Sequence, residues 1–335
     1  MTPIKECLIN NKTDLTPIWL MRQAGRYLPE FKEIRKNNPN FINLCLNSKL
    51  SREITLQPIK RFGFDAAIIF SDILMIPYGL GQKVEFKKNF GPNLADFEMD
   101  KLLEIDEEEF TKNLSSIYEL LVDLRKHEDL KKKDIIGFVG APWTLLVYMI
   151  NKVSPKNGLI SNFFSDTVLI NTLLEILDKY IKIHIKNQVN AGATMIQIFD
   201  SWSGLIKSDF DKYLYDPTLS LVNYTKSLGV PVICFPRGIT DYNQFCKIVK
   251  PSMINIDYEV DPKSLLKNID TPVQGGLHPE VLLTNKVHLK KEVNKYLEIF
   301  RDHPYVFNLG HGILPETKIE MVEELVKIVR NYKCI

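Results

Sequence analysis

Seven short apolar runs, each rich in valine and isoleucine, recur along this 335-residue chain. Their apolar residues are continuous instead of alternating, as in parallel strands that are buried on both faces. Patterns of helical spacing separate the runs, most clearly over residues 168–192, which end at Gly192, and over 318–332. The runs cover residues 66–72, 135–142, 195–201, 231–238, 253–257, 272–276 and 305–312, and a weaker eighth run covers 17–21.

This alternation predicts an α/β fold, a single closed (β/α)8 barrel of the TIM type with an N-terminal extension. We expect one domain over residues 1–335, because no linker rich in proline, glycine or serine divides the chain. The N-terminal extension and the long stretch from Asp72 to Phe110 account for the length beyond a minimal barrel. A doubly wound sheet is the alternative, but the chain has no G-x-G-x-x-G or Walker motif.

The composition excludes several classes of partner. Lys+Arg 43 nearly balance Asp+Glu 41 and no basic stripe occurs, which argues against a nucleic-acid partner. No apolar run of 18 residues occurs, so we expect neither a membrane span nor a signal peptide. The five cysteines are scattered without zinc-type spacing, a pattern typical of reduced thiols in a soluble cytoplasmic protein. These are Cys7, Cys45, Cys234, Cys246 and Cys334.

The ends of the predicted strands locate a candidate site, because barrels of this class carry their active sites there. These ends hold Asp72, Asp200, Ser201, Arg237, Asp257 and His311, and no trio of metal ligands. Asp72 precedes the apolar residues 73–77, which predicts a carboxylate with apolar neighbours. For Asp200 and Asp257, the alternative interpretation is that each caps the helix that follows it. The glycines on both sides of His311 indicate that backbone or substrate approaches closely.

The segment PIWLMRQAGRYLPEF, residues 17–31, places Arg22 and Arg26 four residues apart. In a helix both guanidinium groups would lie on one face, where like charges repel unless an anion lies between them. A solvated basic face is the alternative interpretation. The apolar run before Arg22 and the glycine before Arg26 favour a buried backbone that carries both charges into a pocket for an anionic substrate.

Five motifs occur in a fixed order, all within residues 17–315: PIWLMRQAGRYLPEF, FSDIL, GFVGAPWTLLVYM, FDSWSG and FNLGHGI. Together they resemble the uroporphyrinogen decarboxylase family. The resemblance implies a single (β/α)8 barrel, a homodimer, and a reaction without metal or other cofactor. It also implies the substrate and reaction: the four acetate side chains of uroporphyrinogen III lose carbon dioxide, giving coproporphyrinogen III in haem biosynthesis.

The resemblance implies the site residues motif by motif. Its substrate contacts fall on Arg22, Gln23, Ala24, Gly25, Arg26, Asp72, Tyr148, Ser201 and His311. Asp72 matches the family's aspartate that accepts hydrogen bonds from the pyrrole N–H groups, and Asp72, Arg22 and Arg26 are the expected catalytic residues. Without the resemblance, the simplest interpretation of Tyr148 is that it is a core aromatic residue on a helix. The segment QGGLHP (274–279) departs from the family's usual QGNLDP, and FPRG replaces the common FPKG with the charge retained.

Two other classes of function stay open at this point. A zinc- or corrinoid-linked methyltransferase has a similar fold but needs three or four converging ligands. Cys234 is the one cysteine within a predicted strand, and no cysteine lies two residues after His311. A non-catalytic tetrapyrrole carrier would keep the basic residues without requiring an ionised carboxylate at the macrocycle centre.

Overall fold

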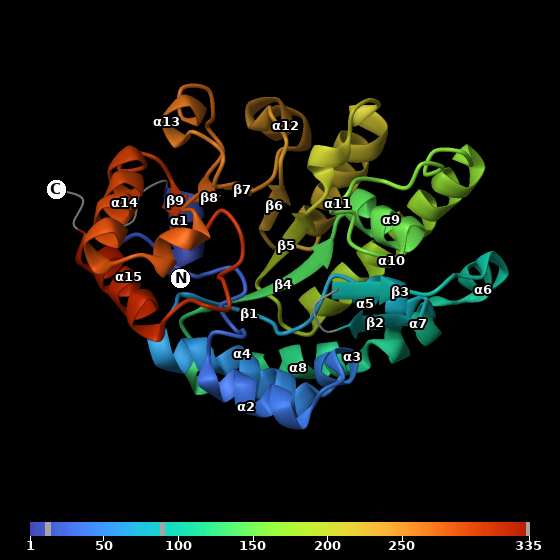
Figure 1. Cartoon of the computed structure of the whole chain (residues 1–335), viewed down its shortest axis with the longest axis horizontal. Helices are drawn as coiled ribbons and strands as arrows, with labels where there is room; N and C mark the ends of the chain where they lie inside the picture. The colour runs from blue at the N-terminus through green and yellow to red at the C-terminus, as the bar shows by residue number, and fades with distance from the viewer. Residues whose placement is uncertain (11–14, 88–90, 333–335) are drawn as a thin grey trace.

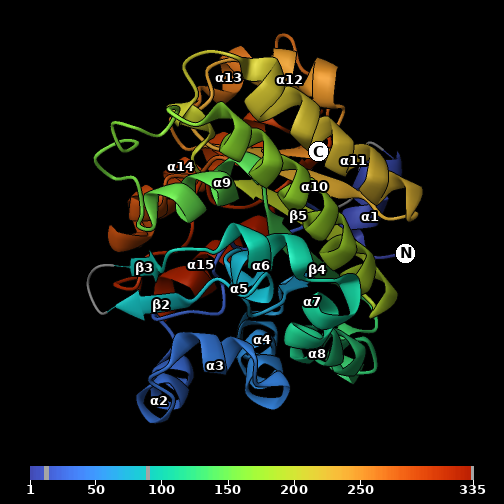
Figure 2. The ribbon, with the colours of Figure 1, turned by 90° about the vertical axis from the view of Figure 1, so that its right-hand side faces the viewer.

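The computed structural model describes residues 1–10, 15–87 and 91–332. Within these residues, seven strands form one parallel sheet in the order β1-β4-β5-β6-β7-β8-β9. The sheet curls through the interior of the molecule and helices cover its outside (Figures 1 and 2). Together with the closure described below, this arrangement confirms the predicted (β/α)8 barrel.

The strands of the barrel are β1 (Ala66–Ile68), β4 (Asp134–Gly140), β5 (Met195–Asp200), β6 (Val232–Pro236), β7 (Met253–Ile256), β8 (Val273–Gly275) and β9 (Tyr305–Val306). A separate antiparallel pair consists of β2 (Val84–Lys87) and β3 (Gly91–Leu94). The helices are α1 (Pro3–Asn10), α2 (Pro29–Asn37), α3 (Phe41–Cys45), α4 (Ser48–Phe62), α5 (Met75–Gly79), α6 (Met99–Glu104), α7 (Glu107–Asn113), α8 (Ser115–Arg125), α9 (Pro142–Asn151), α10 (Thr167–Asn190), α11 (Asp216–Ser227), α12 (Tyr242–Val249), α13 (Pro262–Leu265), α14 (Lys286–Ile299) and α15 (Ile319–Asn331).

The weak eighth run, residues 17–21, closes the barrel between its two edge strands. Phe307, directly after β9, donates its backbone N–H to Pro17 O at 2.8 Å and accepts from Trp19 N at 3.3 Å. On the other side, Asp65, directly before β1, donates its backbone N–H to Ile18 O at 2.9 Å. The segment therefore occupies the eighth strand position, although its pairing is limited to one isolated bridge, between Ile18 and Phe307.

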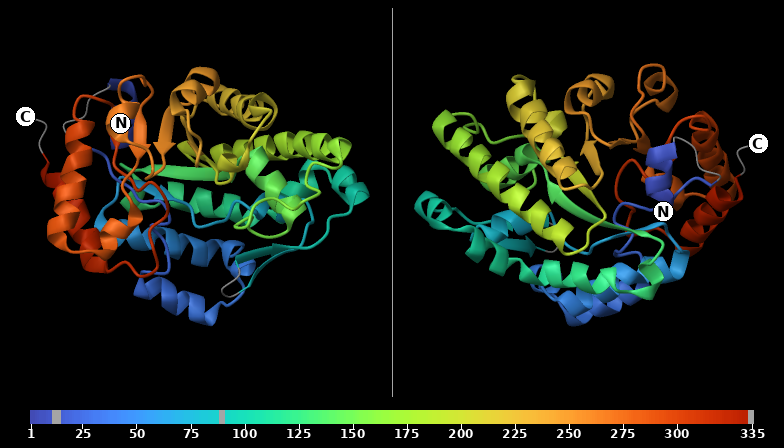
Figure 3. Two further views of the ribbon diagram at one scale, coloured as in Figure 1. Left: turned by 45° about the horizontal axis from the view of Figure 1, so that its top comes forward. Right: turned by 180° about the vertical axis from the view of Figure 1, so that it is seen from behind.

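An ion pair fixes this closure from the outside. Arg330 of α15 contacts both carboxylate oxygens of Asp65, with nitrogen–oxygen distances of 2.8 and 2.9 Å. The Asp65 carboxylate also accepts the backbone N–H of Ile18 at 2.7 Å. Helices α14 and α15 lie side by side, and the N-terminal helix α1 lies near them (Figure 3). One carboxylate thus connects the first part of the chain to its last helix.

The long helix α10 shows how the sequence sets an element's limits. Its N-cap, Asp166, accepts the backbone N–H of Leu169 at 2.9 Å, which satisfies one of the free N–H groups of the first turn. The chain leaves the helix before Gly192, whose φ of +119° suits a residue without a side chain. The predicted helix over 168–192 is confirmed with a shift of one or two residues, and α15 confirms the helix predicted over 318–332.

Two predicted strands end earlier than expected. The run 66–72 forms a strand only over β1, and the run 305–312 forms one only over β9. In the second case, the Asn308 side chain accepts the backbone N–H groups of Met21 and Leu309, at 2.9 and 2.8 Å, and so replaces strand pairing. The antiparallel pair β2–β3, inside the long stretch 72–110, was not predicted.

Candidate active site

All seven barrel strands are parallel, so their carboxyl ends meet at one rim. Ser201 follows β5 directly, Asp72 lies four residues after β1, and His311 lies five residues after β9. Tyr148 comes from α9, which begins two residues after β4. The structure therefore brings these four residues, predicted from the motifs, to the same end of the barrel.

The segment that carries Arg22 and Arg26 consists of turns, so the helix considered from their spacing is wrong. Arg22 has a φ of +61°, the left-handed region that side chains other than glycine rarely adopt. Such a conformation costs about 1–2 kcal/mol and persists only where neighbouring contacts impose it. Both arginines keep solvent-accessible surface, although the protein atoms that surround Arg22 partly desolvate its side chain.

Buried hydrogen bonds impose the turn. Gln23 is fully buried; its Oε1 accepts the backbone N–H of Leu20 at 3.1 Å and its Nε2 donates to Ala66 O in β1 at 3.0 Å. The Tyr27 hydroxyl donates to Gln23 O at 2.8 Å. The Gln23 side chain thus fastens the segment to the barrel, while Ala24 and Gly25 are partly exposed.

The glycines around His311 pack against protein atoms. A Cβ on Gly310 would lie 2.2 Å from Tyr258 N, and one on Gly312 would lie 2.3 Å from Cδ of Arg22. Ile313 donates its backbone N–H to Met21 O at 2.9 Å. The loop after β9 therefore presses on the Arg22 segment, which explains the close approach that the sequence indicated.

The charged groups of the rim influence one another. Desolvation raises the pKa of Asp72 to about 6, although its hydrogen bond from Leu74 N (2.9 Å) and the charge of Arg22 oppose this rise. Desolvation lowers the pKa of Arg22, while Asp72 and Tyr148 act in the opposite direction. Desolvation, with the charges of Arg22 and Arg237, lowers the pKa of His311 to about 3, so this imidazole is neutral at physiological pH. Arg22 therefore lies within electrostatic reach of Asp72, Tyr148 and His311.

Asp200 and Asp257 do not cap the following helices, so that alternative is wrong for both. Asp200 is buried and its Oδ1 accepts the Thr144 hydroxyl at 2.5 Å. Asp257 is buried and pairs with Arg237, with 3.3 Å between Oδ2 and Nε. Helix α13 takes its cap from Asp261 instead. The strand-end position identified both carboxylates, but nothing in the sequence indicated Thr144 as a partner.

The sequence model "Uroporphyrinogen decarboxylase (URO-D)" matches residues 2–332. The chain belongs to the uroporphyrinogen decarboxylase family. The uroporphyrinogen decarboxylase of Rickettsia bellii is 41% identical over 99% of this chain and 98% of the relative. That of Rickettsia africae is 40% identical over 97% of this chain and 94% of the relative. Membership confirms the resemblance drawn from the motifs and places the chain among decarboxylases, which are carboxy-lyases.

A methyltransferase from Methanosarcina mazei has the same fold as this uroporphyrinogen decarboxylase family member. The two structures superpose with a TM-score of 0.78 over 98% of each chain, at 18% sequence identity. At this identity the likeness is one of fold alone. Within the described residues, no group of three or more His, Cys, Asp or Glu side chains has the arrangement of a metal site.

Four cysteines of this family member are buried free thiols, namely Cys7, Cys45, Cys234 and Cys246; Cys334 lies outside the described residues. Strand β6 holds Cys234 as predicted, while Cys45 lies in helix α3 and Cys246 in helix α12. No helix in the described part of the chain combines the length and apolar character needed to span a bilayer.

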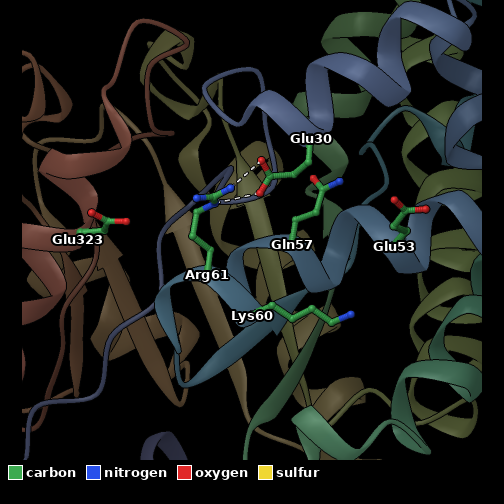
Figure 4. A pocket seen from close by; sticks show the side chains of 6 residues that line it. All are labelled: Glu30, Glu53, Gln57, Lys60, Arg61 and Glu323. Carbon is green, nitrogen blue, oxygen red and sulfur yellow. Dashed lines mark hydrogen bonds and ion pairs between the residues drawn. The ribbon is translucent and has the colours of Figure 1, made fainter.

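An open surface hollow lies away from the strand ends, among helices α2, α4 and α15 (Figure 4). Its lining residues are Glu30, Glu53, Gln57, Lys60, Arg61 and Glu323. Arg61 and Glu30 already satisfy each other there through two hydrogen bonds of 3.0 Å. The hollow contains none of the site residues predicted from the motifs, so the rim of the barrel is the candidate active site of this decarboxylase family member.

Asp200 gives a first testable prediction, on stability. Desolvation raises its pKa to about 7, and Oδ2 has no partner among the described residues. Between pH 5 and 7 the folded chain keeps a proton that the unfolded chain has lost, so rising pH destabilises the wild type over this window. In Asp200→Asn this penalty disappears, and the variant's stability relative to wild type is expected to improve by about 2–3 kcal/mol from pH 5 to pH 8. Urea unfolding at both pH values measures this, with Asp123→Asn on the outer surface as control; a pH-independent difference would contradict the prediction.

Proposed function

We propose that this chain removes the carboxyl groups of the four acetate side chains of uroporphyrinogen III, giving coproporphyrinogen III and four molecules of carbon dioxide in haem biosynthesis. The observation that carries this proposal is that Asp72, Tyr148 and His311, all from family motifs, follow parallel strands at one rim of the barrel, where Arg22 packs against the His311 loop. The names of relatives that are about 40% identical over nearly the whole chain support the same reaction.

In this proposal the rim binds both the charged periphery and the nitrogen-rich centre of the substrate. Arg22 and Arg26 bind substrate carboxylates through charge-assisted hydrogen bonds, each worth roughly 1.5–3 kcal/mol once desolvated. Asp72 accepts hydrogen bonds from the pyrrole N–H groups. The remaining contacts come from the Tyr148, Ser201 and His311 side chains and from the backbone of residues 23–25, since the Gln23 side chain is occupied.

The chemistry requires a sink for the electrons that carbon dioxide leaves behind. A proton added to the ring carbon beside the one that bears the acetate makes the pyrrole an iminium-type cation. Carbon dioxide then leaves, and the electrons of the broken C–C bond form an exocyclic double bond. A proton added to that methylene carbon makes the methyl group, and loss of the ring proton restores the pyrrole. The ring thus supplies its own electron sink.

The charges of the rim residues support these reaction steps. An ionised Asp72 facing the pyrrole nitrogens stabilises the cation where it forms, an electrostatic contribution of about 3–4 kcal/mol for one well-placed group. Arg22 is favoured over Arg26 for the proton transfer because its side chain packs against the His311 loop at Gly312 and its charge reaches Asp72. The neutral His311 does not add a further positive charge next to the developing cation.

We also propose a single domain over residues 1–335, a homodimer, and a cytoplasmic location. The motif resemblance supports the first two, and the reduced-thiol pattern of the cysteines supports the third.

The direct test incubates the purified protein with uroporphyrinogen III in the dark under reducing conditions. Products are separated by carboxyl number. We expect species with seven, six and five carboxyl groups followed by coproporphyrinogen III with four. An unchanged eight-carboxyl substrate, bound but not converted, would instead support the tetrapyrrole carrier.

A second prediction concerns metals, and it separates the decarboxylase from the methyltransferase alternative. Activity is expected to survive exhaustive chelation with less than about a twofold change, because the proposed ring chemistry requires no Lewis acid. Metal content is measured by elemental analysis beside the activity assay. Stoichiometric zinc, with activity lost on chelation and restored by zinc, would overturn the proposal.

A further inference from the structure

Arg237 lies at the active-site rim, yet the family motifs assign it no contact. It follows β6 directly, and β6 lies between β5 and β7 in the sheet. Because Asp200 and Pro236 are register partners, the next residues along these strands, Ser201 and Arg237, are neighbours. Asp257 follows β7 directly on the other side. Arg237 therefore stands between a proposed substrate contact and a buried carboxylate.

Hydrogen bonds hold the Arg237 backbone in place. Its N–H donates to Asp200 O at 3.0 Å, and its carbonyl oxygen accepts from Ser203 Oγ at 2.9 Å and from Gly204 N at 3.1 Å. The side chain is oriented by Asp257, whose carboxylate is only 5% exposed and approaches Nε at 3.3 Å. A cation with a fixed backbone and an oriented stem loses little freedom when it binds a ligand.

The guanidinium group of Arg237 keeps most of its hydrogen-bonding capacity. Arginine carries five N–H donors, and no side-chain hydrogen bond from Arg237 reaches any of the described residues. The Arg61 guanidinium, by contrast, makes two hydrogen bonds to Glu30. The Arg237 side chain is 29% exposed, and its charge reaches His311 and Arg22. It is therefore an accessible cation at the rim with donors that no described residue uses.

We propose that Arg237 binds one carboxylate of the tetrapyrrole substrate, and that Asp257 is a positioning residue that holds its guanidinium group for this contact. The inference deepens the proposed function and rests on it. The closest approach of Asp257 is to Nε, on the inner side of the guanidinium group, which leaves the outer N–H donors to grip a carboxylate. An acid with eight carboxyl groups requires more cations than Arg22 and Arg26 supply, and Arg237 is the next one at this rim.

The test compares steady-state kinetics of wild type with those of Arg237→Met and Arg237→Lys. We expect KM for uroporphyrinogen III to rise about 10-fold or more in Arg237→Met, with kcat within about threefold, because one charge-assisted contact is lost. The lysine variant keeps the charge but loses the planar fork, so an intermediate rise is expected. It also serves as the test if the methionine variant does not fold, which thermal denaturation shows. For Asp257→Asn, we expect a smaller KM increase with kcat unchanged.

Equilibrium binding identifies the carboxylate and does not depend on turnover. Coproporphyrinogen III, which has propionates but no acetates, is titrated while tryptophan fluorescence is followed; Trp202, whose ring lies 6.0 Å from that of Tyr148, is the reporter. Weaker binding to Arg237→Met assigns the contact to a propionate. Unchanged binding with a raised KM for uroporphyrinogen III assigns it to an acetate.

The matched control is Arg52→Met. Arg52 also pairs with one carboxylate, Asp123 at 3.2 Å, but on the outer surface between α4 and α8. Its kinetics and binding are expected to equal those of wild type. The inference fails if both Arg237 variants keep KM and coproporphyrinogen affinity within twofold of wild type, or if Arg52→Met changes them equally. A wild type that leaves uroporphyrinogen at eight carboxyl groups contradicts the proposed function; titration of unconverted uroporphyrinogen III and of coproporphyrinogen III then judges Arg237, and unchanged affinity of the Arg237 variants for both overturns the inference.

Discussion

Asp72→Asn is expected to lower the turnover of uroporphyrinogen at least 100-fold while the protein stays folded. The substitution keeps the shape of the side chain and removes the charge that is proposed to stabilise the pyrrole cation. The structure supports retention of the fold, since the amide oxygen of an asparagine can still accept the N–H of Leu74, which Asp72 accepts at 2.9 Å. The measurement is kcat by product separation, with thermal denaturation as the check on folding.

The same charge predicts the pH profile. With the pKa of Asp72 raised to about 6, the carboxylate takes up a proton as the pH falls through 6. Activity is therefore expected to fall about tenfold for each pH unit below that value. Asp72→Glu is also expected to be impaired, because one extra methylene displaces the charge from the ring centre. Near-normal decarboxylation by folded Asp72→Asn removes Asp72 from the mechanism; Asp123→Asn, on the outer surface, is the control.

Replacing Arg22 or Arg26 by lysine is expected to raise KM for uroporphyrinogen by about 10-fold to 100-fold. An ammonium group cannot grip a carboxylate through two parallel hydrogen bonds as a guanidinium group can. Lysine and arginine meet the same backbone restriction at the φ of +61°, so the substitution at Arg22 tests the side chain alone. Of these two variants, a lower kcat is expected only for Arg22→Lys, because Arg22 is the residue proposed to take part in the proton transfer.

Salt dependence provides the second measurement for these variants. The affinity of the lysine variants is expected to depend more strongly on salt than that of Tyr148→Phe, which removes a neutral hydroxyl. Tyr148→Phe is a suitable comparison because the Tyr148 ring is buried and packs edge-on against Trp202. If both lysine variants bind and react as wild type does, the solvated basic face was the correct interpretation of this segment.

The barrel could be predicted from the sequence because its signals are local and repeated. Continuous apolar runs such as 195–201 identify strands buried on both faces, and the strand β5 matches that run to within one residue. The exceptions have long-range causes. Residues 17–21 occupy a strand position through bonds to Phe307 and Asp65, and the run 305–312 ends early where the Asn308 amide replaces strand pairing. Neither partner can be read from spacing along the chain.

The candidate site could be predicted only in part, for a similar reason. Strand-end positions located Asp72, Asp200 and His311, and the family motifs assigned roles to Asp72 and His311. The left-handed turn at Arg22 could not be foreseen, because it depends on Gln23 reaching β1 and on Met21 meeting a loop nearly 300 residues later. The pairing of Arg237 with Asp257 likewise depends on the order of strands in the sheet.

The clamp between Asp65 and Arg330 has a consequence for how the enzyme is made. This ion pair holds residues 17–21 in the eighth strand position, and these residues lead directly into Arg22. The same residues also require Phe307 as their partner. A nascent chain on the ribosome can therefore pair this strand only after Phe307 has emerged, and gains the ion pair that secures it only once helix α15 has emerged. Contacts between the two ends of a chain close the longest possible loop and form late in folding. A translation product that ends before α15 would thus lack this ion pair and would hold the segment that leads into Arg22 less firmly at the rim.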